Sequence, residues 1–170
     1  MNLIDTFQNL VAQVPDLVQP LIVALAGAIP FIEGEGAATI GVVGGIHPVV
    51  AALAAIVGNF VCVAALVLVS SGARQAILTR RDGSRGPAPV DEGSERKAAR
   101  RAKFHRAFER YGVPGVSLLG PLLLPTQFTA TMLASAGIGK ARVLFWQAVA
   151  IIGWTTVVTV IVSTALNAIR

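Results

Sequence analysis

Two acidic residues, Glu33 and Glu35, lie in the middle of a long apolar stretch, where carboxylates are unusual. Their immediate neighbours Gly34 and Gly36 would let backbone amides or a small ligand approach closely. A charge inside a bilayer costs about 2.5 kcal/mol or more and usually has a function. Two carboxylates this close repel each other, so one of them can hold a proton at neutral pH. The pair predicts a proton-coupling or substrate-binding element, and the alternative is a pair that is simply solvated at an aqueous mouth.

A second polar group, Thr126, Gln127 and Thr129, directly follows Pro125 in another apolar stretch. These side chains are neutral donors and acceptors, and a helix that begins at such a break presents backbone amides that attract anions. We predict that this group binds a polar part of a substrate. The alternative is that the hydroxyls only satisfy carbonyls that the prolines leave free.

No other combination of residues indicates an enzyme or a metal site. The sequence has one cysteine, Cys62, and two distant histidines, a set that does not match a zinc site. Neither a nucleophile–base pair nor a phosphate-binding loop of recognisable spacing occurs. We therefore expect no catalytic residue, no metal and no cofactor.

The composition points to a bilayer as the solvent. Hydrophobic residues make up 54% of the 170 residues and charged residues 14%, whereas about a quarter of the residues in soluble proteins are charged. Of the 14 Lys and Arg residues, 11 lie between Arg74 and Arg110. A basic block between apolar runs is typical of a topology signal rather than of nucleic-acid binding. We expect one integral membrane domain over residues 1–170. Its expected partners are membrane lipids, and we expect it not to bind nucleic acid.

Four apolar segments have to position the polar residues. Residues 48–73 and 143–169 are uncharged and exceed the roughly 20 residues that cross about 30 Å of hydrocarbon. Residues 17–46 and 113–139 are interrupted, and each half is too short to span. The interrupting residues are Gly27, Pro30, Gly34, Gly36, Gly120, Pro121 and Pro125. Irregular backbone in a membrane is tolerated only inside protein or beside water. We therefore predict two transmembrane helices and two re-entrant helical hairpins, with Gly34 and Gly36 allowing close packing at the first tip.

The two halves of the chain follow the same order, a broken segment and then a spanning helix, which predicts an inverted repeat. Paired interrupted segments in corresponding positions point to a transporter site. By the positive-inside rule the basic loop is cytoplasmic. The N-terminus then lies outside, and the hairpins face each other from opposite sides.

The remaining segments are expected at the membrane surface. Residues 79–93 read as a cytoplasmic linker, residues 94–111 as a basic amphipathic helix on the inner leaflet, and residues 1–14 as an amphipathic N-terminal helix. The basic helix would contact lipid headgroups through Arg100, Arg101, Lys103 and Arg106. Together these features predict a multi-pass protein of a bacterial-type cytoplasmic (inner) membrane.

Short motifs resemble known membrane families. The run Gly27-Ala28-Ile29-Pro30 resembles the signature of the small multidrug export protein family, and residues 30–35 are more distantly similar to the hairpin tip of the DedA/VTT superfamily. Gly120-Pro121 and Pro125-Thr126 look like the second tip, although Leu119 and Gln127 stand where DedA-like proteins carry arginines. The resemblance implies facing re-entrant hairpins and transport of a lipid or other amphiphile, such as a polyprenyl phosphate or a phospholipid.

Three hypotheses for the function follow. The first is a small transporter of lipids or other amphiphiles, proton-coupled through Glu33 or Glu35, with its site between the hairpin tips. The second is a small multidrug or ion exporter, and the third is a non-transporting membrane assembly factor. Because two spanning helices are few for a pathway, we expect a homo-oligomer.

Overall fold

The computed structural model describes residues 3–81 and 112–169, and every regular element in these ranges is a helix. The predicted all-helical class is therefore confirmed for them. The helices are α1 (Leu3–Gln13), α2 (Gln19–Gly27), α3 (Glu33–Val43), α4 (Pro48–Arg81), the apolar helix Gly112–Leu122 that ends in the 3-10 turn η1 (Gly120–Leu122), α6 (Thr126–Ser135) and α7 (Lys140–Ile169). The predicted basic helix 94–111, with Arg100, Arg101, Lys103 and Arg106, lies outside the described residues.

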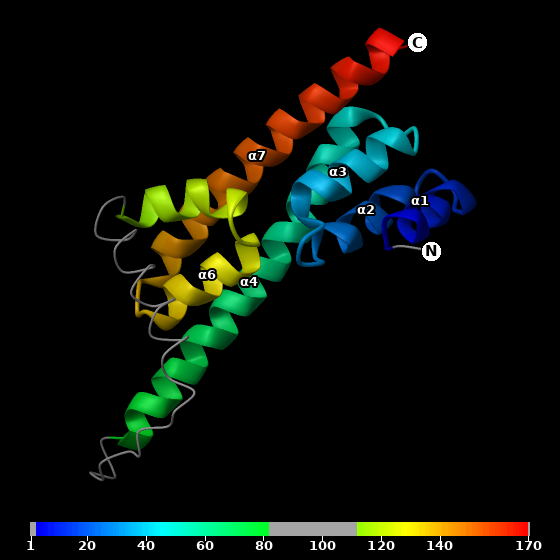
Figure 1. Ribbon diagram of the computed structural model, residues 1–170. Coiled ribbons are helices and arrows are strands. Elements are labelled where there is room, and N and C mark those ends of the chain that lie inside the picture. The colour runs from blue at the N-terminus through cyan, green and yellow to red at the C-terminus, as the bar shows by residue number, and fades with distance from the viewer. Residues whose placement is uncertain (1–2, 82–111, 170) are drawn as a thin grey trace.

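Among the described residues, the long helices α4 and α7 are the two that have the length and composition to cross a membrane. They pack against each other and run in opposite directions (Figure 1). Both exceed the uncharged runs that predicted them, because α4 continues past residue 73 to Arg81 and α7 begins at Lys140. Residues 79–81 of the predicted linker are therefore helical, and its remainder, residues 82–93, lies outside the described residues. Most residues just after 73 are good helix formers, and the first glycine of the basic loop is Gly83.

Each long helix has one buried stripe with a four-residue spacing. On α4 the stripe is Ala51, Ala55, Asn59, Val63 and Val67, and on α7 it is Val143, Gln147, Ile151, Thr155 and Thr159. Residues four apart share a helix face, so the stripes are the surfaces that pack inside the molecule. The outward faces carry exposed large apolar side chains, including Leu53, Val61 and Leu68 on α4 and Ile152 and Ile161 on α7.

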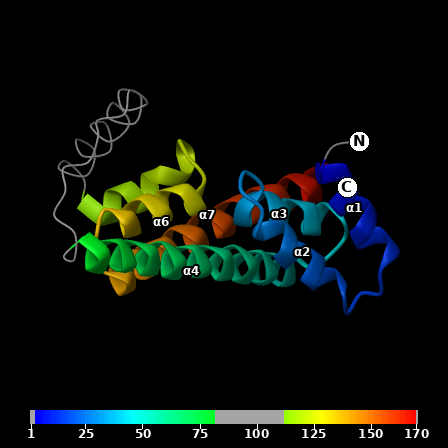
Figure 2. The ribbon, with the colours of Figure 1, turned by 90° about the horizontal axis from the view of Figure 1, so that it is seen from below.

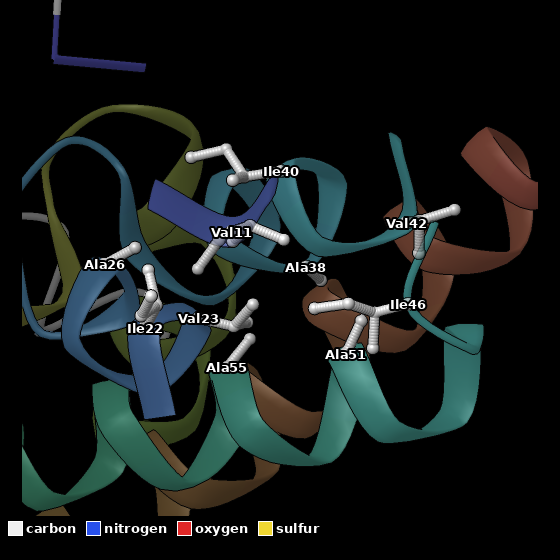
Figure 3. Close-up of a cluster of buried hydrophobic side chains, with 11 residues drawn as sticks. Val11, Ile22, Val23, Ala26, Ala38, Ile40, Val42, Ile46, Ala51 and Ala55 are labelled. Carbon is white, nitrogen blue, oxygen red and sulfur yellow. The ribbon is translucent and has the colours of Figure 1, made fainter. Parts of the chain in front are cut away.

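The first broken segment covers the N-terminal half of α4. Helices α2 and α3 pack together and against α4, and α1 lies across both (Figures 1 and 2). A cluster of buried side chains joins these four helices, including Ile22, Val23, Ala38 and Ala55 (Figure 3). The backbones of α2 and α4 approach so closely that a Cβ on Gly58 would lie 1.8 Å from a carbonyl oxygen of α2. Small residues that permit such approach are typical of helix packing in membranes.

The second broken segment covers the opposite half of the long helices. The helix Gly112–Leu122 precedes α6, and α6 packs against both α4 and α7 (Figure 2). A second cluster of buried apolar side chains holds this half together: Val63, Val67, Val113, Ala130, Leu133, Ala134, Val143 and Ile151. The two apolar clusters therefore lie on either side of the level at which the two breaks occur.

Both breaks fall where glycine and proline predicted them, but the first is shorter than expected. Helix α2 ends at Gly27 and α3 already begins at Glu33, so Gly34 and Gly36 are helical. An acidic residue in the first turn is favourable because it faces the positive end of the helix dipole. In the second break, Pro121 lies in η1 and Pro125 immediately precedes α6.

Candidate functional site

The two breaks meet near the middle of the molecule, and Glu33 and Thr126 form the contact. One carboxylate oxygen of Glu33 accepts a hydrogen bond from the Thr126 hydroxyl at 2.6 Å and another from the Thr126 backbone N–H. Glu33 is only 7% exposed, and Thr126 is buried. Residues 93 positions apart in the chain thus close one interaction between the two broken segments.

Glu33 serves as the cap that α6 lacks in its own sequence. The residue before α6 is Pro125, whose side chain makes no capping hydrogen bond, and its extended backbone (φ −51°, ψ 141°) turns the chain into the helix. The first amides of a helix need acceptors from elsewhere, and a carboxylate at this end also meets the positive end of the dipole. The Glu33 carboxylate supplies both from the other segment.

The backbone at the first tip is held in an uncommon conformation. Phe31 and Glu33 have φ values of +73° and +53°, in the left-handed region that side chains other than glycine seldom adopt. Such residues cost of order 1–3 kcal/mol and persist where the surrounding structure imposes them, often at functional sites. The Phe31 ring also meets Phe128 of α6, with ring centroids 6.3 Å apart. The tip is thus strained where it presents Glu33 to α6.

Two amide side chains extend the contact to α4. Gln127 Nε2 donates to Asn59 Oδ1 at 3.2 Å, and the Thr126 hydroxyl oxygen lies 3.4 Å from the same Asn59 oxygen. Since a hydroxyl has one hydrogen, the much shorter contact to Glu33 is the one that the Thr126 hydroxyl donates. Both amide side chains are buried. The network therefore joins α3, α4 and α6.

Thr155 brings α7 to the same place. A Cβ built on Gly34 would lie 2.2 Å from Thr155 Oγ1 and 3.6 Å from Asn59 Nδ2, so the three residues adjoin. Thr155 Oγ1 and Asn59 Nδ2 are buried and have no hydrogen-bond partner among the described residues. We call Glu33, Asn59, Thr126, Gln127 and Thr155 the central polar site. It contains at least one side chain from each of α3, α4, α6 and α7. Two of its polar atoms, Asn59 Nδ2 and Thr155 Oγ1, remain able to form hydrogen bonds.

The other predicted residues have different surroundings. Glu35 is half-buried, and its recorded hydrogen bond is from the Thr39 hydroxyl to its backbone carbonyl, at 2.8 Å. The Thr129 hydroxyl donates to the Pro125 carbonyl at 3.4 Å, which is the role the alternative reading of the sequence assigned to it. Close packing at the tip holds for Gly34, but a Cβ on Gly36 would meet only Ile32 of its own segment. The structure therefore unites Glu33, Thr126 and Gln127 but does not bring Glu35 or Thr129 to them.

Asn59 was missed because it is a single amide in a long apolar run, and Thr155 because it is one of several threonines in another. A signal did exist: Asn59 lies four residues from both Ala55 and Val63, and Thr155 four from Ile151. Polar residues on the packing stripe of a membrane helix face the bundle interior. The spacing of the apolar residues along each helix would therefore have placed both side chains in the interior of the bundle.

The central polar site can bind a polar group and exchange a proton. Its donors are the first amide of α6, two amide side chains and two hydroxyls, and Glu33 is its one titratable group. Moving Glu33 away would free the α6 amide, which attracts anions. Within residues 3–81 and 112–169, no three His, Cys, Asp or Glu side chains group as metal ligands.

Comparisons with protein-family models, curated proteins and solved structures found no match to this chain.

Proposed function

We propose that this chain is a small integral membrane transporter of lipids or other amphiphiles, with the contact between Glu33 and Thr126 as its internal gate. The observation that carries the proposal is a carboxylate buried against the start of α6, in the middle of a helical bundle whose other buried side chains, among the described residues, carry no charge. A buried carboxylate in a membrane segment is expensive and marks a substrate or proton pathway.

The exposure of the long helices supports a membrane setting. Only 28% of the most apolar window of α4 and 22% of that of α7 is buried inside the protein. The core helix of a soluble protein would be mostly buried, and soluble monomers seldom expose contiguous apolar surface of this extent. Lipid tails are the solvent that this surface fits.

In this proposal the two broken segments are facing re-entrant hairpins of an inverted repeat. Their tips approach each other through Glu33 and Thr126, and the two segments cover opposite halves of the antiparallel pair α4 and α7. The basic loop would lie in the cytoplasm of a bacterial-type cell, the N-terminus outside, and the protein would act as a homo-oligomer. Transporters with inverted repeats place their site where such broken segments meet.

An amphiphile fits because polar and apolar features lie at one level of the bundle. Beside Asn59 on α4, an apolar hollow of about 260 Å³ opens between α4 and α7. Its lining consists of Ile56, Val57, Phe60, Val61, Ala148, Ile151 and Ile152. A headgroup at the central polar site and a chain against this hollow would use both features.

The proposed cycle depends on the proton of Glu33. With Glu33 ionised, its contact with the α6 amide and the Thr126 hydroxyl is charge-assisted and strong. Proton uptake removes the charge and weakens the contact, which frees donors of α6 for a polar headgroup. Proton movement and headgroup binding would thus compete for one site.

The test is a lipid-translocation assay with the purified full chain in phosphatidylglycerol vesicles. Fluorescent lipid in the outer leaflet is bleached by a membrane-impermeant reductant, and the rate at which inner-leaflet lipid becomes accessible measures translocation. We expect Glu33→Gln to slow translocation by about tenfold or more, because an amide can neither take up nor release the proton of the proposed cycle and so cannot re-form the charge-assisted contact, a bond worth about 1.5–3 kcal/mol. Asp16→Asn, an exposed carboxylate outside the bundle, is the matched control.

Each outcome separates the hypotheses. If the wild-type chain moves lipid no faster than empty vesicles, lipid transport is wrong, and proton-driven uptake of a lipophilic cation in the same vesicles would favour the exporter instead. If lipid moves but Glu33→Gln equals the control, the gate is wrong. If the chain moves no substrate and deletion of residues 94–111 abolishes its cellular role, the assembly-factor hypothesis is supported.

A further inference from the structure

A second polar feature lies far from the central polar site, where the end of α4 passes the turn between α6 and α7. A hollow of about 210 Å³ opens there. It is lined by Ser71, Arg74, Gln75, Ala134, Gly137, Ile138, Gly139 and Lys140. No carboxylate is among these residues, and two of them, Arg74 and Lys140, carry a positive charge. The four acidic residues of the described ranges all lie within the first 35 positions.

The guanidinium of Arg74 lies close to Gly137 in the turn between α6 and α7. Gly137 has φ +92°, and a Cβ on it would lie 2.6 Å from Arg74 Nη2. A side chain at this position would therefore be strained and would displace the guanidinium. The glycine thus leaves room for the exposed Arg74 side chain to lie against the wall of the hollow.

The start of α7 adds to the positive potential. Lys140 is the first residue of this 30-residue helix, and its first amides point toward the N-terminal end. Arginine binds phosphate oxygens through two parallel hydrogen bonds, and lysine binds them as a point charge. A phosphate group matches a hollow with one guanidinium, one ammonium and a helix N-terminus.

The position of the hollow along α4 also fits a membrane headgroup region. Arg74 is 15 residues beyond Asn59, which corresponds to about 22 Å along the helix. If the central polar site lies at the bilayer midplane, this places Arg74 at the headgroup level, about 20–22 Å from the centre. The hollow then opens on the side of the basic loop.

We propose that this hollow is a phosphate-binding site, with Arg74 and Lys140 as its cationic ligands. It is separate from the central polar site and does not depend on transport. Its ligand is a phosphate monoester or diester, carried by a lipid headgroup or by a soluble phosphate compound.

The test is isothermal titration calorimetry of the full chain in neutral detergent with three probes: dihexanoyl phosphatidic acid, dihexanoylglycerol and inorganic phosphate. We expect phosphatidic acid to bind and dihexanoylglycerol, which lacks only the phosphate, not to bind. Arg74→Gln should weaken binding at least about tenfold, the size expected for a lost charge-assisted bond. Inorganic phosphate that binds with the same dependence on Arg74 identifies a soluble ligand as sufficient, whereas binding of phosphatidic acid alone identifies a lipid headgroup.

Two further variants keep the proposal falsifiable. Arg142→Gln removes the same charge from an exposed position on the first turn of α7, outside the hollow, and should change the affinity less than about twofold because the charge is screened by water. Gly137→Ala keeps every charge but displaces the guanidinium, and should weaken binding as Arg74→Gln does. Equal binding of phosphatidic acid and dihexanoylglycerol, or equal weakening by Arg74→Gln and Arg142→Gln, would overturn the proposal, and circular dichroism checks that each variant is folded.

Discussion

The coupling between Glu33 and Thr126 can be measured by a double-mutant cycle on the stability of the folded protein. Glu33→Met removes the carboxylate at similar length, and Thr126→Val removes the hydroxyl at similar volume while the backbone N–H stays. The cycle therefore isolates the 2.6 Å bond between the hydroxyl and the carboxylate. The free energy of unfolding would be measured for the wild type, both single variants and the double variant.

The expected coupling energy is about 1–2 kcal/mol. Hydrogen bonds to charged groups are worth about 1.5–3 kcal/mol in general, whereas neutral ones between membrane helices average about 0.6 kcal/mol and reach about 1.7. The Glu33 bond is short and buried, and it joins two segments 93 residues apart. It should lie between the two ranges, since the α6 amide shares the same acceptor oxygen.

The assay is denaturant titration in mixed micelles followed by far-ultraviolet circular dichroism. Thr131→Val is the control, because the Thr131 hydroxyl donates to a carbonyl of its own helix at 2.6 Å, and its cycle with Glu33→Met should give no coupling. If the coupling between Glu33 and Thr126 is no larger than this control value, the bond between the Thr126 hydroxyl and the Glu33 carboxylate contributes nothing to folding, and the gate proposed at this contact is wrong.

Three more predictions address the packing and the topology. Gly34→Ala should destabilise the protein by about 1–3 kcal/mol through overpacking. Adding Thr155→Ala should restore much of the loss, because it removes the oxygen that would lie 2.2 Å from the new Cβ. Thermal unfolding of both single variants and of the double variant measures this, and the absence of rescue would contradict the contact. Asn59→Ala should lower the free energy of unfolding by about 1–3 kcal/mol, because the buried Gln127 amide on α6 loses its hydrogen-bond acceptor. Denaturant titration measures this. Ser84→Cys in a Cys62→Ala background should react with a membrane-impermeant maleimide only from the cytoplasmic side, and labelling in intact cells would reject the topology.

The helices and breaks were predictable because their signals are local. Uncharged runs over residues 48–73 and 143–169 exceed the length that crosses a bilayer, and each lies within an observed long helix. Pro30 and Pro125 lie at the observed breaks, since proline removes a backbone donor and clashes with the preceding turn. The ends of the long helices were predicted less well, because a charged residue such as Lys140 ends an apolar run without ending the helix.

The different positions of Glu33 and Glu35 could not be predicted. Residues two apart on a helix point to nearly opposite sides, about 200° apart at 3.6 residues per turn. Only one of the pair can therefore meet α6, and the order of Glu and Gly does not indicate which. The backbone at Glu33, with φ +53°, decides it. A positive φ is not a local preference of glutamate, so the sequence around Glu33 did not indicate it.

Under the proposed function, the central polar site binds a polar group and does not only stabilise the fold. On α4 the buried stripe is apolar above and below Asn59, and an apolar residue there would leave no unpaired amide nitrogen. Asn59 Nδ2 and Thr155 Oγ1 are both without a partner among the described residues, and each unpaired buried polar group costs about 1–3 kcal/mol. A purely structural layer would satisfy its own atoms. In the proposed transporter, these two open donors, which adjoin Gly34 where the two broken segments meet, would bind a polar headgroup or take part in proton transfer.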